Sequence, residues 1–524
     1  MAIFISDIRS TFSPPITANT MGVLQTKRIL IFQQRGWGKR IGHFLAVKLQ
    51  AEGCTLGALT FKRSTHDFVT SQKEVTYEKI YSVDEVRENP AEHLGADAVT
   101  LKQICDELEI DSVWPLAMSL RHHVRSYGDK YYYGFKQNVS DEGIADYVKA
   151  MYQLVKQIFD EFRPDVVITP NFVSLPHLLF DRLAAKRGVP MIGVSDSKVR
   201  GYAIFVHNQL ENTGTFHDRL SALNAGTADS ANSERARQYV KEFREKFKRP
   251  EYHDNLYKKI TLWKQVKREL SPYYYSVRWL LDSNRKINYL PNLGITIDYK
   301  PPRIKLRDHY AQKRYARFME RFTFYQLDKI DKYVYFPLQV QPEATIDVRS
   351  PYFSNQIETA RLIAMSLPDD YTLVVKEHPV MVGKRPPSYI EKVARTVNVK
   401  LIDYRIPSDQ VLRRASLVIG PSCTTLAEAA FYRKPAIQLG NLGTTEQLPN
   451  VFKHTDMTTL SKKIKELLAV NLDTPEYERR LENYIAAAYD EGFDFNYWGV
   501  WDRGEKENME KLWDAYKRQL KLLV

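Results

Sequence analysis

Two polar segments in the second half of the chain carry the residue types of an anion-binding site. Lys376-Glu377-His378-Pro379 follows the strand-like run 371–375, and Gly420-Pro-Ser-Cys-Thr-Thr425 follows the apolar run 416–419. A lysine ammonium, an imidazole and hydroxyl groups can all donate hydrogen bonds to phosphate oxygens. The second segment also opens a helical stretch, and the amino end of a helix attracts anions. Together the two segments predict a phosphate-binding site.

Each segment alone has a simpler explanation. Ser or Thr at a helix start is most often a cap for the first backbone N–H groups, and a His-Pro dipeptide is by itself weak evidence. Both segments, however, follow strands of one predicted parallel sheet, and Glu428 lies one helical turn further on. Ligands of open parallel sheets bind at the carboxyl ends of the strands. The combination therefore favours a nucleotide site in which Glu428 accepts hydrogen bonds from ribose hydroxyls.

Short apolar runs alternate with amphipathic segments in two separate parts of the chain, which is the pattern of parallel sheets covered by helices. The predicted strands of the first part are 28–33, 54–60, 165–169 and 189–194. Those of the second part are 333–336, 371–376, 399–402, 416–419 and 435–438. The sequence predicts an α/β protein with two doubly wound Rossmann-like domains that face a cleft.

The same alternation sets the predicted domain boundaries. We expect a flexible N-terminus over 1–25, a Rossmann-like domain over 26–225 and a second one over 326–472. Between the two domains, 226–325 loses the alternation and reads as a basic helical insertion or connector. The last segment, 473–524, is predicted to be helical and ends in a basic amphipathic stretch.

Most of the excess positive charge lies in the connector. The whole chain has a net charge of +13, and residues 241–320 alone contain 20 Lys or Arg against 9 Asp or Glu. Aromatic side chains are interleaved with these charges, as at Trp263 and Tyr273–Tyr275. Such a surface suits anionic lipid head groups, an anionic glycan or nucleic acid. A solvated face on long helices explains the same composition.

Other features of the composition predict a cytoplasmic protein. The three cysteines are widely spaced and form no CxxC pair, which disfavours a disulfide framework or a structural zinc site. No segment approaches the ~20 apolar residues of a membrane span, and we see no signal peptide. Peripheral contact with the inner membrane face, through 241–320 and the C-terminal helix, is compatible with this expectation.

The C-terminal half also resembles a known family. Three motifs carry the resemblance: Gln341-Pro342-Glu343, Lys376-Glu-His-Pro379 and Ser422-Cys-Thr-Thr-Leu-Ala-Glu428. They are similar to those of the capsule polysaccharide biosynthesis proteins, which include bacterial β-Kdo transferases (Kdo is 3-deoxy-manno-octulosonic acid). The segments 164–172 and 196–201 resemble the same proteins more loosely. The resemblance implies a glycosyltransferase of the GT-B type.

The family pattern assigns roles to individual residues. The His-Pro and Ser/Thr motifs are shared with GT-B bacterial sialyltransferases, where they grip the CMP of the donor. By this resemblance His378 and Ser422 or Thr424 hold the donor phosphate. The complete predicted donor-binding set is Gln341, Lys376, His378, Pro379, Ser422, Thr424, Thr425 and Glu428. The motifs do not exclude UDP- or GDP-linked donors, because these residues would contact the phosphate and not the base.

Glycosyl transfer also needs a carboxylate near the anomeric carbon. Glu343 is the C-domain candidate, because Gln341-Pro-Glu follows a strand facing the cleft. Asp196, after the strand 189–194, is the candidate from the other domain, and a structural role as a turn or cap residue is the alternative. Either one can act as base, or as nucleophile if configuration is retained, and Glu343 can instead position the sugar. Without an Asp-x-Asp motif near a strand end, we expect metal-independent transfer and no cofactor.

The N-terminal domain is expected to bind the acceptor. Gly36-Trp37-Gly38 follows the first strand, and we interpret it as a turn that borders the cleft. Its glycines permit close backbone approach, and Trp37 offers a face for stacking on a sugar; a tight turn with a packed Trp is the alternative. Asn171, His177 and Arg200 are further acceptor-side candidates.

Three other functions stay open at this stage. A nucleotide-sugar 2-epimerase or a polyol-phosphate transferase can use the same scaffold. A non-catalytic protein that binds membranes or nucleic acid would use the basic stretch 241–320 instead, although we see no nucleic-acid motif there and expect no nucleic-acid partner. A lectin-like inactive relative is the third. The leading hypothesis is transfer of a nucleotide-activated, CMP-linked sugar to a glycan or lipid-linked acceptor.

Overall fold

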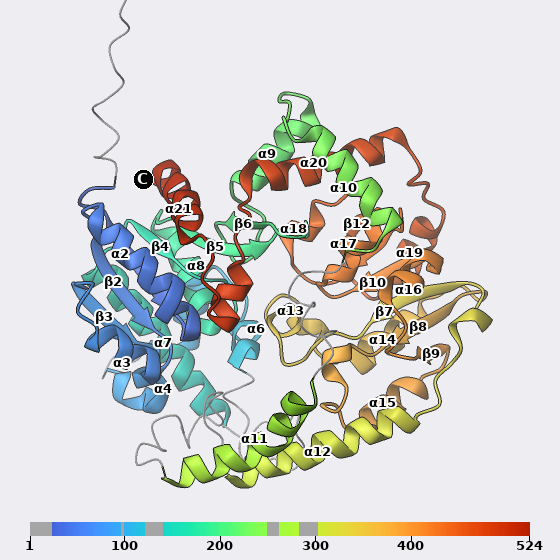
Figure 1. Ribbon diagram of the computed structural model, residues 1–524, viewed down its shortest axis with the longest axis horizontal. Helices are drawn as coiled ribbons and strands as arrows, with labels where there is room; N and C mark the ends of the chain where they lie inside the picture. The colour runs from blue at the N-terminus through green and yellow to red at the C-terminus, as the bar shows by residue number, and fades with distance from the viewer. Residues whose placement is uncertain (1–23, 96–98, 121–139, 249–260, 282–301) are drawn as a thin grey trace, which may run out of the picture.

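Two parallel β-sheets, each covered by helices, dominate the computed structural model (Figure 1). The structure describes residues 24–95, 99–120, 140–248, 261–281 and 302–524. Most of the predicted flexible N-terminus, together with 249–260 and 282–301 of the predicted connector, lies outside these residues.

The first sheet has six strands in the order β3-β2-β1-β4-β5-β6. Their bounds are β1 (Arg28–Gln33), β2 (Thr55–Thr60), β3 (Lys79–Ser82), β4 (Val166–Ile168), β5 (Met191–Asp196) and β6 (Ala203–Val206). The pairs from β3 to β5 are parallel, and β6 runs antiparallel to β5 at the edge. The central strands are runs of Ile, Leu and Val because both faces of the sheet are covered by helices.

Helices on both faces complete this first domain. They are α2 (His43–Ala51), α3 (Arg63–Ser71), α4 (Val83–Glu88), α5 (Leu101–Leu108), α6 (Trp114–Ala117), α7 (Asp141–Glu161), α8 (Leu175–Lys186) and α9 (Thr215–Ala225). The longest, α7, begins where the side chain of Ser140 accepts a hydrogen bond from Gly143 N. Its apolar residues recur at helical spacing and pack into the core beside α8.

The second sheet has six strands in the order β12-β11-β10-β7-β8-β9, all parallel. They are β7 (Tyr333–Pro337), β8 (Thr372–Lys376), β9 (Val399–Ile402), β10 (Leu417–Gly420), β11 (Ala436–Gln438) and β12 (Val451–Lys453). The associated helices are α13 (Ala344–Asp347), α14 (Gln356–Met365), α15 (Pro387–Ala394), α16 (Ser408–Arg414), α17 (Thr424–Phe431), α18 (Gly443–Glu446) and α19 (Leu460–Leu468).

The remaining helices connect the two domains. In the predicted connector, α10 (Ser233–Glu245) packs against α20 (Pro475–Glu491), whereas α11 (Leu262–Leu281) and α12 (Pro302–Arg321) lie together along one edge of the molecule, at the bottom of Figure 1. After α20 the chain returns to the first domain. There Phe493, Tyr497 and residues of α21 (Met509–Leu523) join the same core cluster as β1 and α2.

One buried polar cluster ties the domains to each other. The carboxylate of Glu211, after β6, accepts hydrogen bonds from Ser195 in its own domain and from Arg349 and Thr444 in the other. Glu211 and Arg349 are both buried and form an ion pair. A charge taken out of water needs such partners, so the cluster depends on the contact between the domains.

The predicted architecture of two doubly wound domains, GT-B, is confirmed. Each of the nine predicted strands corresponds to an observed one, but the edge strands β3, β6 and β12 had not been predicted. The turn predicted at Gly36-Trp37-Gly38 is wrong. That segment is helical, with a short helix α1 (Arg35–Trp37) that continues into the π-helix Gly38–Gly42 and then α2.

Candidate active site

The carboxyl ends of β7, β8, β9 and β10 surround a cavity of about 650 Å³, which we call the donor-side cavity. Its lining includes Glu343 and Thr345 after β7, Lys376 to Val380 at the end of β8, Tyr404 to Ser408 after β9, and Cys423, Thr424, Thr425 and Glu428 after β10. The cavity lies at the edge of the sheet where ligands of parallel sheets are expected to bind. Of the eight predicted donor-binding residues, Lys376, His378, Pro379, Thr424, Thr425 and Glu428 line this cavity.

His378 is held in a defined orientation. It caps the short 3₁₀ turn Pro379–Met381, and its Nδ1 accepts a hydrogen bond from Val380 N at 3.2 Å. In the neutral imidazole the proton then resides on Nε2, which makes that atom a hydrogen-bond donor. Pro379 occupies the first position of the turn, where a missing N–H costs nothing. The local sequence therefore presents a ring donor at the cavity wall.

Lys376 supplies a positive charge from the end of β8. Its side chain is buried, and Nζ donates to the carbonyl of Ile406 at 2.8 Å and to Ser408 Oγ at 3.1 Å. These partners belong to the segment after β9, so the ammonium also anchors a second wall of the cavity. Sequence reasoning placed Lys376 correctly but did not anticipate that it holds Ser408.

The amino end of α17 faces the same cavity. The helix begins at Thr424, one residue after its N-cap Cys423, and both Thr424 and Thr425 line the cavity. Ser422 does not. It is fully buried, its Oγ lies 3.0 Å from Ser350 Oγ, and it donates to the carbonyl of Pro421. The predicted contact of Ser422 with phosphate is therefore wrong, and the two threonines present the hydroxyls.

The two polar residues of the motif after β7 have different positions: Glu343 lies at the cavity, and Gln341 lies in the protein interior. Glu343 lines the donor-side cavity and caps α13, with Oε2 accepting a hydrogen bond from Thr345 N at 2.9 Å. Gln341 instead is buried and bonds to Asp347, to the carbonyl of Ser354 and to Gln356. It is absent from the cavity lining, so its prediction as a donor-binding residue is wrong. Gln341 fixes the turn that carries Glu343.

A smaller pocket joins the N-terminal domain to this region. Asp196, Lys198 and Arg200 line it from the first domain, and Thr424 and Glu428 line it from the second. Thr424 and Glu428 thus border both hollows. Asp196 accepts hydrogen bonds from the backbone N and the Nζ of Lys198, at 3.0 and 3.3 Å. The structure brings Asp196 and Arg200 to the interdomain face, as predicted from sequence, and their chemical roles stay predictions.

The glycine-flanked tryptophan lies elsewhere. Trp37 is fully buried, and its Nε1 donates to Tyr497 Oη at 2.7 Å. Gly36 approaches the carbonyl of Trp501, and Gly38 packs directly against the backbone of Gln33. The close approach that these glycines permit is therefore to the protein itself. The predicted stacking of Trp37 on a sugar, with Gly36 and Gly38 bordering the cleft, is wrong.

His177 is also part of the core. It is fully buried between Phe32 and Phe61, and its ring nitrogens contact Ser174 Oγ at 2.7 Å and Gln34 Oε1 at 3.2 Å. Burial lowers the pKa of His177 to about 3. Its prediction as an acceptor-side residue is wrong, because no ligand reaches it. Asn171 is half-buried and lines neither of the two hollows, and its acceptor role stays a prediction.

Sequence reasoning missed two groups that shape the cavity. Glu377 is 1% exposed and lines the cavity, with Oε1 accepting from His378 N at 2.6 Å and from Arg385 at 2.5 Å. Arg385 also donates to the carbonyl of Gln339 after β7. The exposed Arg405 lines another wall. Because it follows a strand that had been predicted at 399–402, the same strand-end rule could have found it.

Among the residues that the structure describes, no three His, Cys, Asp or Glu side chains form a group that could hold a metal ion. Within the same residues, no helix has the length and apolar character required to cross a membrane. The predicted independence of a metal is a separate matter and stays a prediction.

Comparison with known proteins finds only distant similarity. No family model and no curated protein matches the chain. Among solved structures, the β-Kdo 2,7 transferase KpsC of Thermosulfurimonas dismutans is 13% identical, with 64% of this chain and 80% of that chain covered and a TM-score of 0.33. The UDP-GlcNAc 2-epimerase of Neisseria meningitidis, bound to UDP-GlcNAc, is 11% identical over 89% and 98% of the chains, with a TM-score of 0.25.

A third similar structure is the UDP-forming α,α-trehalose-phosphate synthase of Burkholderia vietnamiensis. It is 11% identical over 94% of this chain and 100% of that chain, with a TM-score of 0.29. At such identities and scores the likeness assigns no substrate or reaction to this chain. The fold is established by its own two sheets, and the function has to be argued from the cavity.

Proposed function

We propose that this protein is a glycosyltransferase that moves a sugar from a nucleotide donor to a glycan or lipid-linked acceptor in the cytoplasm. One observation carries the proposal: a ring donor, an ammonium and the hydroxyls of a helix start line a single cavity between the ends of four strands. These are His378, Lys376, Thr424 and Thr425. Donors of this kind, converging from separate loops, are suited to a phosphate group.

The cavity is suited to stabilising a leaving phosphate. In glycosyl transfer the bond from the anomeric carbon to the phosphate oxygen breaks, and negative charge moves onto the phosphate. Preorganised donors lower the barrier most when they meet charge as it develops. We assign this task to His378 Nε2, to the Lys376 ammonium and to the amino end of α17. Because these groups come from the protein, we propose that no divalent metal is needed, and undiminished activity in EDTA tests this.

Two carboxylates are candidates for the reaction at the acceptor. The acceptor hydroxyl forms a bond to the anomeric carbon and gives its proton to a base. Asp196 lies in the interdomain pocket, which shares Thr424 and Glu428 with the donor-side cavity. Glu343 lines the donor-side cavity and has one oxygen engaged by Thr345 N. We assign the base to Asp196 and the positioning of the sugar to Glu343, and loss of kcat in Asp196→Asn with an unchanged donor Kd tests this.

The donor class is proposed to be a CMP-linked acid sugar such as CMP-Kdo. The support is the similarity of the three C-domain motifs to those of β-Kdo transferases. A thermal-shift screen with CMP, CDP, UMP, UDP and GDP tests it directly, since a ligand at 100 times its Kd stabilises by roughly 2.7 kcal/mol. A selective rise with CMP supports the proposal, and a selective rise with UDP or GDP replaces the donor class.

Variants separate binding at this cavity from binding elsewhere. His378→Gln should lose most of the nucleotide-dependent shift, whereas His93→Gln, at an exposed position, should keep it. Donor turnover without any acceptor would favour an epimerase on the same scaffold. The absence of any nucleotide effect, with steeply salt-dependent binding to nucleic acid, would contradict the proposal altogether.

A further inference from the structure

Exposed apolar side chains are concentrated on one helix. Among the described residues, ten of the twenty exposed large apolar side chains belong to α11. Only Pro272 and Ser276 of this 20-residue helix are buried. Monomeric proteins rarely expose a large contiguous apolar surface unless it binds something. We therefore expect the exposed apolar surface of α11 to bind a partner.

The exposed side chains of α11 form a defined stripe. At 100° per residue, Pro272, Ser276 and the half-buried Glu269 and Trp279 share the face that packs on α12. The opposite face carries Trp263, Leu270, Tyr274 and Leu281, which are 76%, 59%, 60% and 81% exposed. Lys267 and Arg278 lie on the same side at helical spacing and are exposed. We call these six residues the outer stripe, and it contains no acidic residue.

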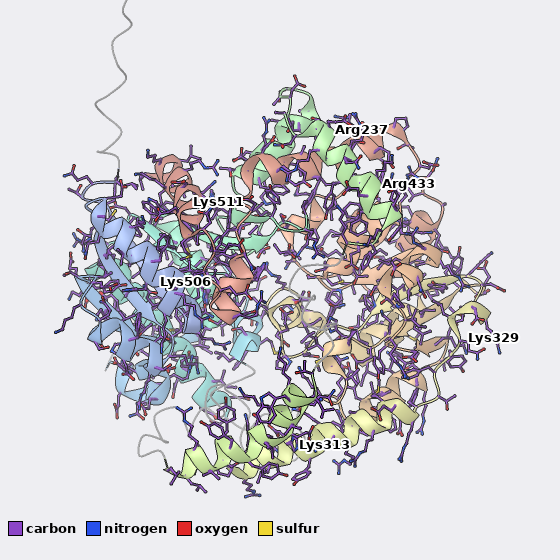
Figure 2. The ribbon with its side chains drawn as sticks, viewed as in Figure 1. Arg237, Lys313, Lys329, Arg433, Lys506 and Lys511 are labelled. Atoms are coloured by element: carbon purple, nitrogen blue, oxygen red, sulfur yellow. The ribbon has the colours of Figure 1, made fainter. Side chains whose placement is uncertain are left out.

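The acidic residue of α11 is turned inward. Glu269 forms an ion pair with Lys313 of α12, and Tyr273 Oη lies 2.5 Å from Tyr310 Oη. Figure 2 shows Lys313 within this helix pair. These contacts fix the rotation of α11 about its axis, so the outer stripe faces solvent.

The second helix anchors the pair to the C-terminal domain. On α12, Ile304, Tyr315 and Met319 are buried, and Met319 belongs to the core cluster of the second sheet. Gly383, with φ of +80°, brings its loop so close to Gln312 that an added Cβ would lie 2.9 Å from the Gln312 carbonyl oxygen. The same connection after β8 contains His378. The outer stripe is thus carried by a helix pair that is attached beside the donor-side cavity.

We propose that the outer stripe of α11 is a docking surface for an anionic lipid membrane. Trp and Tyr with Leu between them bury in the head-group region, while Lys and Arg at the margin extend to lipid phosphates. The charge of the pair is complementary to such a surface: α11 and α12 together contain eleven Lys or Arg and three Asp or Glu. The helix lies on the membrane and does not cross it.

Lipid explains the stripe better than two other partners. A polyanion in water, such as nucleic acid or an acidic glycan, engages Lys and Arg but gains little from exposed Leu270 and Leu281. A second copy of the chain packed stripe against stripe would bring Lys267 and Arg278 of both copies into one interface, where like charges repel. An anionic membrane satisfies both the apolar and the basic side chains.

Vesicle flotation with the full chain tests the proposal and needs no substrate, so its result is independent of the proposed transferase activity. The protein should float with phosphatidylcholine vesicles that contain about one third phosphatidylglycerol, and not with phosphatidylcholine alone. Each basic residue near the surface contributes roughly fivefold in affinity. Lys267→Glu/Arg278→Glu should therefore weaken binding by at least about 25-fold.

Matched variants control for charge and for apolarity. Lys329→Glu/Lys506→Glu changes the net charge equally at two exposed positions away from the helix pair (Figure 2), and it should bind almost as the wild type. Trp263→Ser/Leu270→Ser should lose at least about tenfold, whereas Met365→Ser/Val397→Ser, also exposed, should not.

Three outcomes would overturn the proposal. One is failure of the wild type to float with anionic vesicles. Another is equal loss in the stripe variants and their controls. The third is a change of partner: a dimer that Trp263→Ser/Leu270→Ser dissociates, or binding to RNA or an acidic glycan that this apolar variant leaves unchanged. Circular dichroism of each variant confirms that the fold is retained.

Discussion

The buried ion pair beside His378 allows a quantitative test of how the donor-side cavity is built. Arg385 bonds to Glu377 Oε1 and to the carbonyl of Gln339, so it joins the segments after β8 and β7. Glu377 is 1% exposed, and its Oε2 has no hydrogen-bond partner among the described residues. Arg385→Met therefore leaves a buried carboxylate without its cation. Removing one partner of such a pair costs about 3–5 kcal/mol.

Calorimetry measures this cost as a shift in Tm. A change of 3–5 kcal/mol lowers the Tm of a domain of this size by roughly 10 °C. Arg395→Met is the matched control. Arg395 is exposed, and its Nη2 forms a long ion pair of 3.9 Å with Glu391 Oε2 at the surface of α15. An exposed ion pair of this kind contributes about 0–1 kcal/mol to stability. Glu377→Gln/Arg385→Met removes the uncompensated charge and should recover part of the loss.

The pair also supports the ring that we assign to the donor phosphate. Glu377 Oε1 accepts the His378 backbone N–H at 2.6 Å, so Arg385→Met should weaken nucleotide binding as well as stability. Isothermal titration well below the melting temperature separates the two effects. The reasoning is refuted if Arg385→Met melts within about 2 °C of Arg395→Met, or if the double variant is no more stable than the single one.

Three further predictions concern the start of α17, Trp37 and His177. Thr424→Val should weaken nucleotide binding by roughly tenfold through loss of a hydrogen bond to phosphate, whereas Ser422→Ala should leave the Kd unchanged and lower the Tm, both measured by titration and melting. Trp37→Phe should cost about 1–3 kcal/mol of stability through the lost bond to Tyr497 without changing the KM for any acceptor; a raised KM would restore the stacking role. Burial lowers the pKa of His177 to about 3, from 6.5 for the free group. Below pH 6.5 the unfolded chain therefore binds a proton at this residue, whereas the folded chain binds it only near pH 3. The free energy of unfolding falls as the pH drops between these two values. Between pH 6.5 and about pH 4.5 the loss amounts to about 2 kcal/mol, and urea unfolding should show that His177→Gln lacks it, whereas the exposed-site variant His93→Gln keeps it.

The central strands were predictable because their environment leaves a clear signal. A strand covered on both faces must be apolar at every position, as in 29–32 and 373–375. The unpredicted edge strands β3 and β12 are paired on one side only and are partly polar. β3 reads Lys-Ile-Tyr-Ser and begins exposed, and β12 reads Val-Phe-Lys with no residue buried. The sequences of β3 and β12 do not differ from those of loops, so alternation could not reveal them. This reason does not apply to β6, which is apolar and buried.

The donor-side cavity was predictable to within a residue. Strand ends fix which segments gather at one edge of a sheet, and this rule placed His378 and the start of α17 together. It does not fix which side chain of a segment points outward. That depends on where the helix begins: with Cys423 as the N-cap, Thr424 and Thr425 lie in the first turn and face the cavity, while Ser422 is turned into the core. A shift of one position therefore separates a residue that lines the cavity from a residue that packs in the core.

The failures in the N-terminal domain have a different physical origin, which is distance along the chain. Trp37 meets Tyr497 across 460 residues, and Arg40 donates to the carbonyls of Val500 and Trp501. The segment that covers the end of β1 therefore comes from the opposite terminus of the protein. A local pattern of glycines around a tryptophan is the same whether the close neighbour is a sugar or a returning chain. Only the path of the polypeptide after α20 decides between them, and in this protein it makes the C-terminal helices part of the N-terminal core.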